Sequence, residues 1–317
     1  MARRGETACG AAQVSEGRGG RWPAQAWLFA ACPSVLMAVS MTDDASRVID
    51  SLEGTDPLRE PTLLSAIQAL HLPTGSRGLD IGCGIGLQVL LLADATQPSG
   101  HVTGLDISRP LLAHARQKVG GSPIADRIAF SQGDMRRLPF RDDVFDWAWS
   151  VDCAGYPSGN LLPILKEICR VVRPGGSISL LAWSSLQLLP GHAMLEARLN
   201  ATCSAYAALL QGEPPPAHFQ RALHWYSQAG LVKATCTTLV GQVQAPLRPE
   251  LRAALTLLFE MLWGEASANA SSVDIEAYRR LCSPGSPDFI LDVPEYCAFF
   301  TYTMFTGEVA RTLSHLA

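Results

Sequence analysis

Residues 77–93 read Arg-Gly-Leu-Asp-Ile-Gly-Cys-Gly-Ile-Gly-Leu-Gln-Val-Leu-Leu-Leu-Ala, and this stretch decides the fold. It predicts a short apolar strand closed by Asp80, then a glycine turn (Gly82, Gly84 and Gly86), then a helix. Glycine lets the backbone of the turn adopt conformations that a Cβ forbids, so a ligand can lie directly on the main chain. Unpaired N–H groups at the start of the helix favour a carboxylate or phosphate. The stretch therefore predicts a nucleotide-type cofactor site on a βαβ unit.

The spacing of the glycines narrows the choice of cofactor. A dinucleotide-binding turn has the pattern G-x-G-x-x-G and would need a glycine at position 87, where this chain has Leu87. The pattern here is G-x-G-x-G, with Asp80 two residues before the first glycine. It resembles motif I of the class I S-adenosylmethionine (SAM) methyltransferases, in which the turn lies against the methionine and ribose parts of SAM. Taken alone, the turn also fits a strand-to-helix connection without a ligand, or a dinucleotide site of variant spacing.

Two more acidic residues follow at strand-sized intervals. Residues 101–106 predict a second strand ending in Asp106, where an acid can accept both ribose hydroxyls of an adenosine. The alternative for Asp106 is a helix N-cap, for which Ser108 is better placed. Residues 127–135 predict a third strand ending in Gly-Asp-Met, and the resemblance implies that Asp134 faces the adenine amino group while Met135 packs on the ring. Taken alone, Asp134 can also be interpreted as a turn residue, because aspartate is common in turns.

The resemblance implies a cofactor site made from one set of residues at the strand tips. These are Asp80, Gly82, Cys83, Gly84, Gly86, Gln88, Asp106, Ile107, Asp134, Met135 and Val151.

The remaining pattern predicts an α/β fold with a Rossmann-like, doubly wound sheet of seven strands. Residues 147–151 predict the fourth strand, and 177–183 the fifth, after a turn at Arg173-Pro174-Gly175-Gly176. The sixth and seventh are expected at 231–243 and 295–306, and the resemblance implies that the last strand is antiparallel. The resemblance covers roughly Gly78 to Trp183 and points to the small-molecule branch that includes quinone-biosynthesis methyltransferases.

Helical patterns before the first strand and between the last strands predict how the sheet is covered. Pro61 is expected in the first turn of a helix that ends near His71. Two helical insertions, at about 185–215 and 246–292, are expected to form a lid that excludes water and shapes the acceptor pocket. The aromatic residues that could line this pocket are Trp225, Tyr226, Trp263 and Phe299.

Residues 1–40 are not expected to be part of the domain. One interpretation is a signal peptide cleaved after 38–40, but the segment ahead of its apolar run is long and contains Glu6 and Glu16. The preferred interpretation is a disordered extension or a misassigned start, because residues 41–44 (Met-Thr-Asp-Asp) look like a natural beginning. The methyltransferase domain would then span 41–317.

Composition and charge exclude several classes of function. An apolar fraction of 48% allows a sizeable core, and a net charge of −4 argues against nucleic-acid binding. The motifs of cytosine-C5 and amino-directed DNA methyltransferases are also missing. Nine cysteines without a C-x-x-C pair indicate a reducing, cytoplasmic environment and no metal site. The apolar run near residue 30 is too short and broken to predict a membrane span, and the oligomeric state stays open.

The predicted reaction is an in-line displacement at the SAM methyl carbon by a small-molecule acceptor. An acceptor that must lose a proton needs a base, and Asp152, Tyr156 and His192 are candidates by position only. Two rival functions remain. Leu87 argues against a nicotinamide-dependent oxidoreductase, whereas a SAM-binding protein without catalysis would keep the same cofactor residues.

Overall fold

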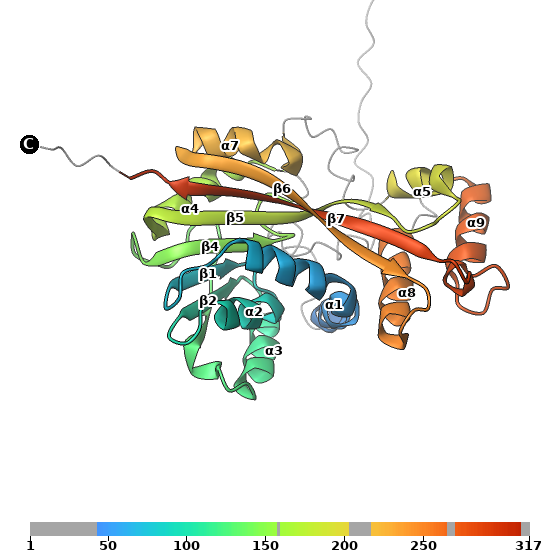
Figure 1. Cartoon of the computed structure of the whole chain (residues 1–317), viewed down its shortest axis with the longest axis horizontal. Coiled ribbons are helices and arrows are strands. Elements are labelled where there is room, and N and C mark those ends of the chain that lie inside the picture. The colour runs from blue at the N-terminus through green and yellow to red at the C-terminus, as the bar shows by residue number, and fades with distance from the viewer. Residues whose placement is uncertain (1–42, 157–158, 203–216, 265–269, 312–317) are drawn as a thin grey trace, which may run out of the picture.

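The computed structural model describes residues 43–156, 159–202, 217–264 and 270–311 (Figure 1). Its strands form one seven-stranded sheet in the order β3-β2-β1-β4-β5-β7-β6. The strands are β1 (Arg77–Ile81), β2 (His101–Asp106), β3 (Ile128–Gln132), β4 (Phe145–Val151), β5 (Val172–Gln187), β6 (Leu231–Gln244) and β7 (Cys297–Val309). Strands β1 to β5 pair in parallel, and β7 runs antiparallel between β5 and β6. The predicted doubly wound sheet with an antiparallel last strand is confirmed.

Helices cover both faces of this sheet. They are α1 (Asp43–Ala69), α2 (Leu87–Ala95), α3 (Arg109–Gly120), α4 (Leu161–Val171), α5 (Ala193–Asn200), α7 (Ala222–Gln228), α8 (Pro249–Trp263) and α9 (Ser272–Cys282), with single turns η3 (Ala125–Arg127), η5 (Phe219–Arg221) and η7 (Ile290–Asp292). Side chains alternate along β4, so Trp147 and Trp149 belong to the core under α1 and α2, while Ala148 belongs to the core under α4 and α7. The helix after β2 begins as predicted, because Ser108 Oγ accepts a hydrogen bond from the Leu111 N–H.

The first helix is longer than the sequence pattern predicts. Pro61 was expected in its first turn, but α1 begins at Asp43 and contains both Pro57 and Pro61. Each proline lacks an N–H, so each removes one bond of the helical ladder. Burial of one face compensates, since Val48, Leu58 and Leu63 are all nearly inaccessible. As a result, residues 43–60, two thirds of α1, precede the position where the helix was predicted to begin.

Strand β5 is also longer than expected, at both ends. The Arg-Pro-Gly-Gly segment at 173–176 was predicted as a turn before the strand, but it lies within β5. It does distort the ladder, because the register with β4 shifts there and Gly175 has a φ of +82°. At the other end, β5 continues past Trp183 and pairs with β7 as far as Gln187 opposite Phe299. Smaller differences are that β1 runs one residue past Asp80, and that β3 stops at Gln132, before the Gly-Asp-Met segment.

Helices α5, α8 and α9 gather around the extended ends of β5, β6 and β7 (Figure 1). Arg198 of α5 is paired with Asp274 of α9, with Nη2 and Oδ1 2.7 Å apart. Trp263 Nε1 of α8 donates to Asn200 Oδ1 at 3.0 Å. The helices expected after the fifth and sixth strands are therefore present, although 203–216 and 265–269 within those insertions lie outside the described residues. The expectation for residues 1–40 also falls outside them.

None of the helices described here combines the length and the apolar character needed to cross a bilayer. No cluster of three or more His, Cys, Asp or Glu side chains suited to a metal ion occurs among the described residues.

Candidate active site

The glycine turn joins β1 to α2 at the carboxyl edge of the sheet. Gly82, Gly84 and Gly86 have φ values of +75°, +52° and +78°, a region that residues with a Cβ rarely adopt. A Cβ on Gly86 would also lie 3.2 Å from both Ala115 Cβ and Phe130 Cζ. Conformation and close packing therefore both require glycine at the start of α2.

Two buried carboxylates converge on this turn. Asp106 holds it, because Oδ2 accepts the Gly84 N–H at 2.9 Å and Oδ1 accepts the Ser108 N–H at 2.8 Å. Asp80 is 2% exposed, and its Oδ2 has no hydrogen-bond partner in the described part of the chain. Burial and the neighbouring charge of Asp106 raise the pKa of Asp80 to about 8, and burial also raises the pKa of Asp106. The site is therefore suited to a ligand that brings positive charge to Asp80.

The other residues predicted for the cofactor lie around the same edge. Cys83, Met135 and Val151 are buried, and Gln88 and Ile107 are half-buried.

Asp134 lies beyond β3 and is held by its own neighbour. Its Oδ2 lies 2.6 Å from Arg136 Nη2, and its Oδ1 accepts the Arg136 N–H at 2.8 Å. These bonds to Arg136 lower the pKa of the Asp134 carboxyl. Asp134 thus has the turn geometry that the sequence left open as an alternative, and a contact with an adenine stays a prediction.

The first half of α1, which precedes the helix start predicted at Pro61, covers the glycine turn. Leu52 approaches Gly84 so closely that a Cβ there would lie 3.4 Å from Leu52 Cδ1. Val48 packs with Ile85 of the turn and Leu111 of α3 in a small apolar cluster. Placing the helix start at Pro61 hid this contact, since all the α1 residues involved precede it.

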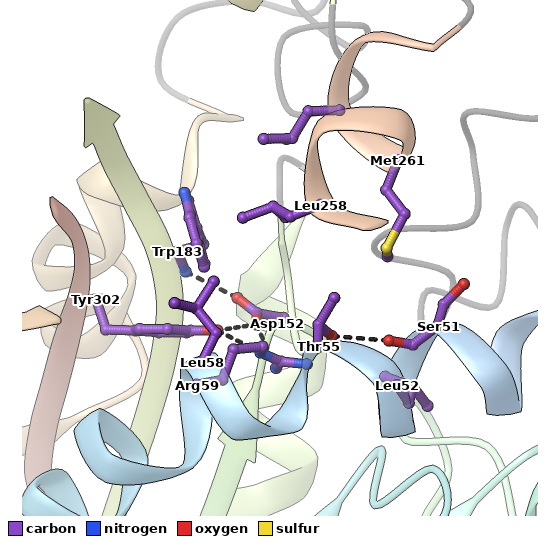
Figure 2. A pocket seen from close by; sticks show the side chains of 11 residues that line it. Ser51, Leu52, Thr55, Leu58, Arg59, Asp152, Trp183, Leu258, Met261 and Tyr302 are labelled. Carbon is purple, nitrogen blue, oxygen red and sulfur yellow. Dashed lines mark hydrogen bonds and ion pairs between the residues drawn. The ribbon is translucent and has the colours of Figure 1, made fainter. Parts of the chain in front are cut away.

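A pocket lies beside the turn, between α1, α8 and the ends of β4, β5 and β7 (Figure 2). It is lined by Ser51, Leu52, Thr55, Leu58, Arg59, Asp152, Trp183, Leu258, Met261, Leu262 and Tyr302. Asp152 comes directly after β4, and β4 pairs with β1 through Trp149 opposite Asp80. The pocket therefore adjoins the turn along the carboxyl edge of the sheet.

Asp152 is the centre of a closed polar network on the floor of this pocket. Its Oδ1 accepts the Trp183 backbone N–H at 2.7 Å. Its Oδ2 accepts from Arg59 Nη2 at 3.0 Å and from the Tyr302 hydroxyl at 2.9 Å. Arg59 Nε in turn donates to that hydroxyl at 2.8 Å. Burial raises the pKa of the Asp152 carboxyl, and the guanidinium and the two other donors oppose the rise.

The three residues predicted as candidate bases are not brought together. Asp152 lines the pocket, but Tyr156 is 4% exposed and its ring packs edge-to-face on Phe219, with centroids 5.8 Å apart. His192 precedes α5, where its carbonyl accepts the Glu196 N–H. Neither Tyr156 nor His192 lines the pocket.

The aromatic residues of the pocket also differ from those expected. Trp225, Tyr226 and Trp263 are core residues, and Phe299 lies 38% exposed on β7. Trp183 and Tyr302 line the pocket instead, both on strands. Sequence reasoning missed Arg59 and Tyr302 as well, because an arginine ahead of the expected helix and a tyrosine within a strand carry no local motif.

The geometry so far defines a doubly wound α/β protein with a cofactor-type turn and an adjoining pocket. Comparison with known proteins narrows this class. The chain matches a methyltransferase domain model over residues 79–176. It is 34% identical over 125 residues to the demethylmenaquinone methyltransferase of Bacillus licheniformis, which covers 38% of this chain and 51% of that protein. It is 28% identical to the 27-O-demethylrifamycin SV methyltransferase of Amycolatopsis mediterranei, over 58% of this chain and 62% of that one.

Solved structures support the fold. A chain of the complex between the Haloferax volcanii Trm112 methyltransferase activator and a methyltransferase superposes with a TM-score of 0.53 at 19% identity, covering 87% of this chain and all of that one. Phosphoethanolamine N-methyltransferase 2 of Haemonchus contortus, in complex with phosphomonomethylethanolamine and S-adenosylhomocysteine, gives 0.51 at 17% identity over 86% of this chain and 61% of that one.

Residues 79–176 thus match a methyltransferase domain, and the curated relatives are named as methyltransferases of small molecules. This confirms the resemblance noted in the sequence. The chain spans about half the length of curated relatives that it matches.

Proposed function

We propose that this protein transfers a methyl group from SAM to a small-molecule acceptor. The observation that carries the proposal is the buried Asp80 carboxylate, whose Oδ2 lacks a partner in the described structure beside a turn of bare main chain. A buried carboxylate without a partner is costly, and a cationic ligand removes the cost. SAM carries an ammonium and a sulfonium group, so its charge fits this position better than that of an anionic dinucleotide does.

The turn and strand tips would hold the cofactor. We assign Gly82, Gly84 and Gly86 to the main-chain surface against SAM, Asp80 to its positive charge, and Asp106 to the ribose hydroxyls. The support for Asp106 is its place at the tip of β2, with Oδ1 and Oδ2 already fixed by backbone N–H groups. The remaining predicted contacts are Cys83, Gln88, Ile107, Asp134, Met135 and Val151.

We assign two contributions to the protein in methyl transfer: it aligns the acceptor with the SAM methyl group, and it excludes water. When bound, SAM supplies an activated methyl group. Holding two reactants in line is worth about 7–11 kcal/mol in favourable cases. α1 and α8 flank the pocket from outside the sheet, and we propose that the helices of the two insertions act as its lid. That proposal rests on Leu258, Met261 and Leu262, which α8 contributes to the pocket wall.

Asp152 is assigned a positioning role rather than that of a general base. Three donors already occupy its two oxygens, namely the Trp183 N–H, Arg59 and the Tyr302 hydroxyl. These bonds fix both oxygens of the carboxylate to α1, β5 and β7, which favours a structural role for it. We infer that Asp152 holds α1, β5 and β7 in register around the pocket.

The proposals for the substrate class and the cellular compartment rest on the names of the relatives and on composition. The curated relatives are named for small molecules, a quinone precursor and a rifamycin, and we propose that this chain also takes a small-molecule acceptor. The net charge of −4 supports the absence of a nucleic-acid partner, and cysteines outside any disulfide, such as buried Cys83 and Cys282, support a reducing, cytoplasmic environment.

A turnover assay tests the proposal. The native protein is incubated with SAM and a panel of phenols, quinols, amines and thiols, and release of S-adenosylhomocysteine is measured. We expect turnover with at least one acceptor, lost in Asp106→Asn and kept in Asp126→Asn, an exposed acid outside the site. Tight SAM binding with no turnover across the panel would favour a non-catalytic SAM-binding protein. Enhanced NADH fluorescence, without SAM binding, would favour an oxidoreductase.

A further inference from the structure

The pocket beside Asp152 combines an apolar wall with charges that cancel. Its wall comes from two helices, with Leu52 and Leu58 on α1 and Leu258, Met261 and Leu262 on α8. The charged side chains among its lining residues are Arg59 and Asp152, and they pair with each other at 3.0 Å. A charged ligand would bring an uncompensated charge into this wall, which is unfavourable at low dielectric. An uncharged apolar ligand meets no such penalty.

Trp183 lines the pocket, and its indole carries a polar group without a hydrogen-bond partner in the described part of the chain. This group, Nε1, is shielded from solvent. The ring is fixed by stacking on Phe300, with centroids 4.6 Å apart and planes 10° from parallel, and by an edge contact with Tyr302. Figure 2 shows the Trp183 ring standing above Asp152 and facing the side of Leu258. A fixed, shielded N–H without a partner costs about 1–3 kcal/mol, and a hydrogen-bond acceptor on a ligand removes this cost.

We propose that this pocket binds the methyl acceptor, and that the acceptor is an uncharged, largely apolar molecule whose oxygen accepts a hydrogen bond from Trp183 Nε1. This proposal rests on the proposed function, and it names the substrate class and a specificity-determining residue. The ligand reaches the indole by displacing α8 side chains of the wall, foremost Leu258, which Figure 2 shows beside the Trp183 ring. Arg59, Asp152 and Tyr302 act as positioning residues, because they are bonded to one another and hold the floor on which the ligand lies.

Position relative to the cofactor turn supports the assignment. Asp152 follows Val151 at the tip of β4, and β4 is the neighbour of β1 in the sheet. Ser150 Oγ donates to the Ile81 carbonyl at 2.8 Å, which ties the two strand tips together. A ligand in the pocket therefore lies beside the edge to which we assign the cofactor, as methyl transfer requires.

The test uses 1-naphthol as an uncharged aromatic probe with one oxygen. Two probes of similar size serve as comparisons: naphthalene, which lacks the oxygen, and 1-naphthylmethylammonium, which is charged. Each is titrated into the full chain saturated with S-adenosylhomocysteine, and the indole N–H signals are followed by ¹⁵N NMR. The Trp183 signal is assigned from Trp183→Phe, which keeps an aromatic ring for stacking and leaves the backbone bond to Asp152 intact.

We expect 1-naphthol to shift the Trp183 indole signal downfield. Naphthalene should bind more weakly and should not cause that shift, and the ammonium probe should not compete with 1-naphthol for the pocket. Trp183→Phe should weaken 1-naphthol binding by about 3- to 10-fold and bring it close to the value for naphthalene. Trp225→Phe, a tryptophan of α7 that does not line the pocket, is the control and should leave binding unchanged.

Other outcomes overturn the inference. Unchanged 1-naphthol affinity in Trp183→Phe, preference for the ammonium probe, or no response to 1-naphthol while S-adenosylhomocysteine is bound would each do so. Failure of the proposed function looks different, because either S-adenosylhomocysteine itself would not bind, or SAM would bind without turnover of any acceptor in the panel.

Discussion

Arg59 and Asp152 stand 93 positions apart in the sequence, yet Nη2 of one lies 3.0 Å from Oδ2 of the other in a nearly inaccessible pair. This pair joins α1, the first helix described, to the tip of the central strand β4. Tyr302 of β7 completes the network by donating to Asp152 and accepting from Arg59. The three elements around the pocket are thus fastened through one carboxylate.

Breaking this network should destabilise the protein in a graded way. Asp152→Asn leaves the buried Arg59 without its counter-charge and should lower the free energy of unfolding by about 3–5 kcal/mol. Tyr302→Phe removes a single hydroxyl and should cost about 1–3 kcal/mol. Tyr278→Phe is the matched control, because the Tyr278 hydroxyl makes only a long bond of 3.4 Å to the Phe259 carbonyl. Urea denaturation measures all three, and equal losses for the three variants would refute a special role for the network.

Two glycine-to-alanine substitutions should have opposite effects. Gly86→Ala places a Cβ 3.2 Å from Ala115 and Phe130 at a φ of +78°, so we expect a loss of about 1–3 kcal/mol and weakened SAM binding. Gly120→Ala at the end of α3 meets no atom within 4 Å and should stabilise by about 0.4–1 kcal/mol. Thermal unfolding of both variants distinguishes the two effects, and a stable Gly86→Ala protein would show that the turn has another conformation.

Asp80 should give the stability of the protein a distinct pH dependence. The pKa of its carboxyl is raised to about 8 in the folded protein, against 3.8 for the ordinary group. Between these values the folded state keeps a proton that the unfolded state has lost, so the free energy of unfolding falls as pH rises from about 4 to about 8. Asp80→Asn cannot titrate. Its melting temperature relative to the native protein should therefore increase across this window, and parallel curves would rule out a raised pKa.

Cofactor binding should have the opposite pH dependence. If the ionised Asp80 carboxylate pairs with a positive group of SAM, affinity should increase with pH up to about 8, by at most about tenfold per unit. Asp80→Asn should bind SAM weakly at every pH, and Asp126→Asn should follow the native curve. A native affinity that is constant between pH 6 and 8 would contradict the pairing.

Tyr156 and His192 should be dispensable for catalysis, because neither lines the pocket. His192→Ala and Tyr156→Phe should change kcat/KM by less than about threefold, whereas Asp106→Asn abolishes turnover. Steady-state assays with the acceptor identified by the panel measure this. A loss of about 100-fold in either variant, with normal folding, would restore that residue as a candidate base.

The sequence predicted most of the sheet because strand tips carry their own signals. Strands β1 and β2 were each predicted from an apolar run that ends in an aspartate, with a glycine turn after β1. The start of α3 was predicted from the N-cap residue Ser108. Parallel strands place such tips at one edge, so the convergence of Asp80, Asp106 and the glycine turn followed from local pattern alone.

The acceptor end could not be predicted in the same way. Arg59, Asp152 and Tyr302 come from three distant segments, and their contact depends on how far α1 extends and on the register of β5 with β7. Pro57 and Pro61 hid the length of α1, because proline inside a helix is tolerated only where tertiary packing compensates. No sequence signal distinguishes Trp183 from other buried aromatic residues, because the unpartnered Nε1 is visible only in the structure.

The SAM site is best tested by calorimetric titration of SAM and S-adenosylhomocysteine into the native protein, Asp106→Ala and Asp126→Asn. We expect micromolar binding of both ligands to the native protein and to Asp126→Asn, and no measurable binding to a folded Asp106→Ala. No heat of binding for either ligand from folded native protein, or full binding by Asp106→Ala, would contradict the assignment of the glycine turn and its two carboxylates as the SAM site.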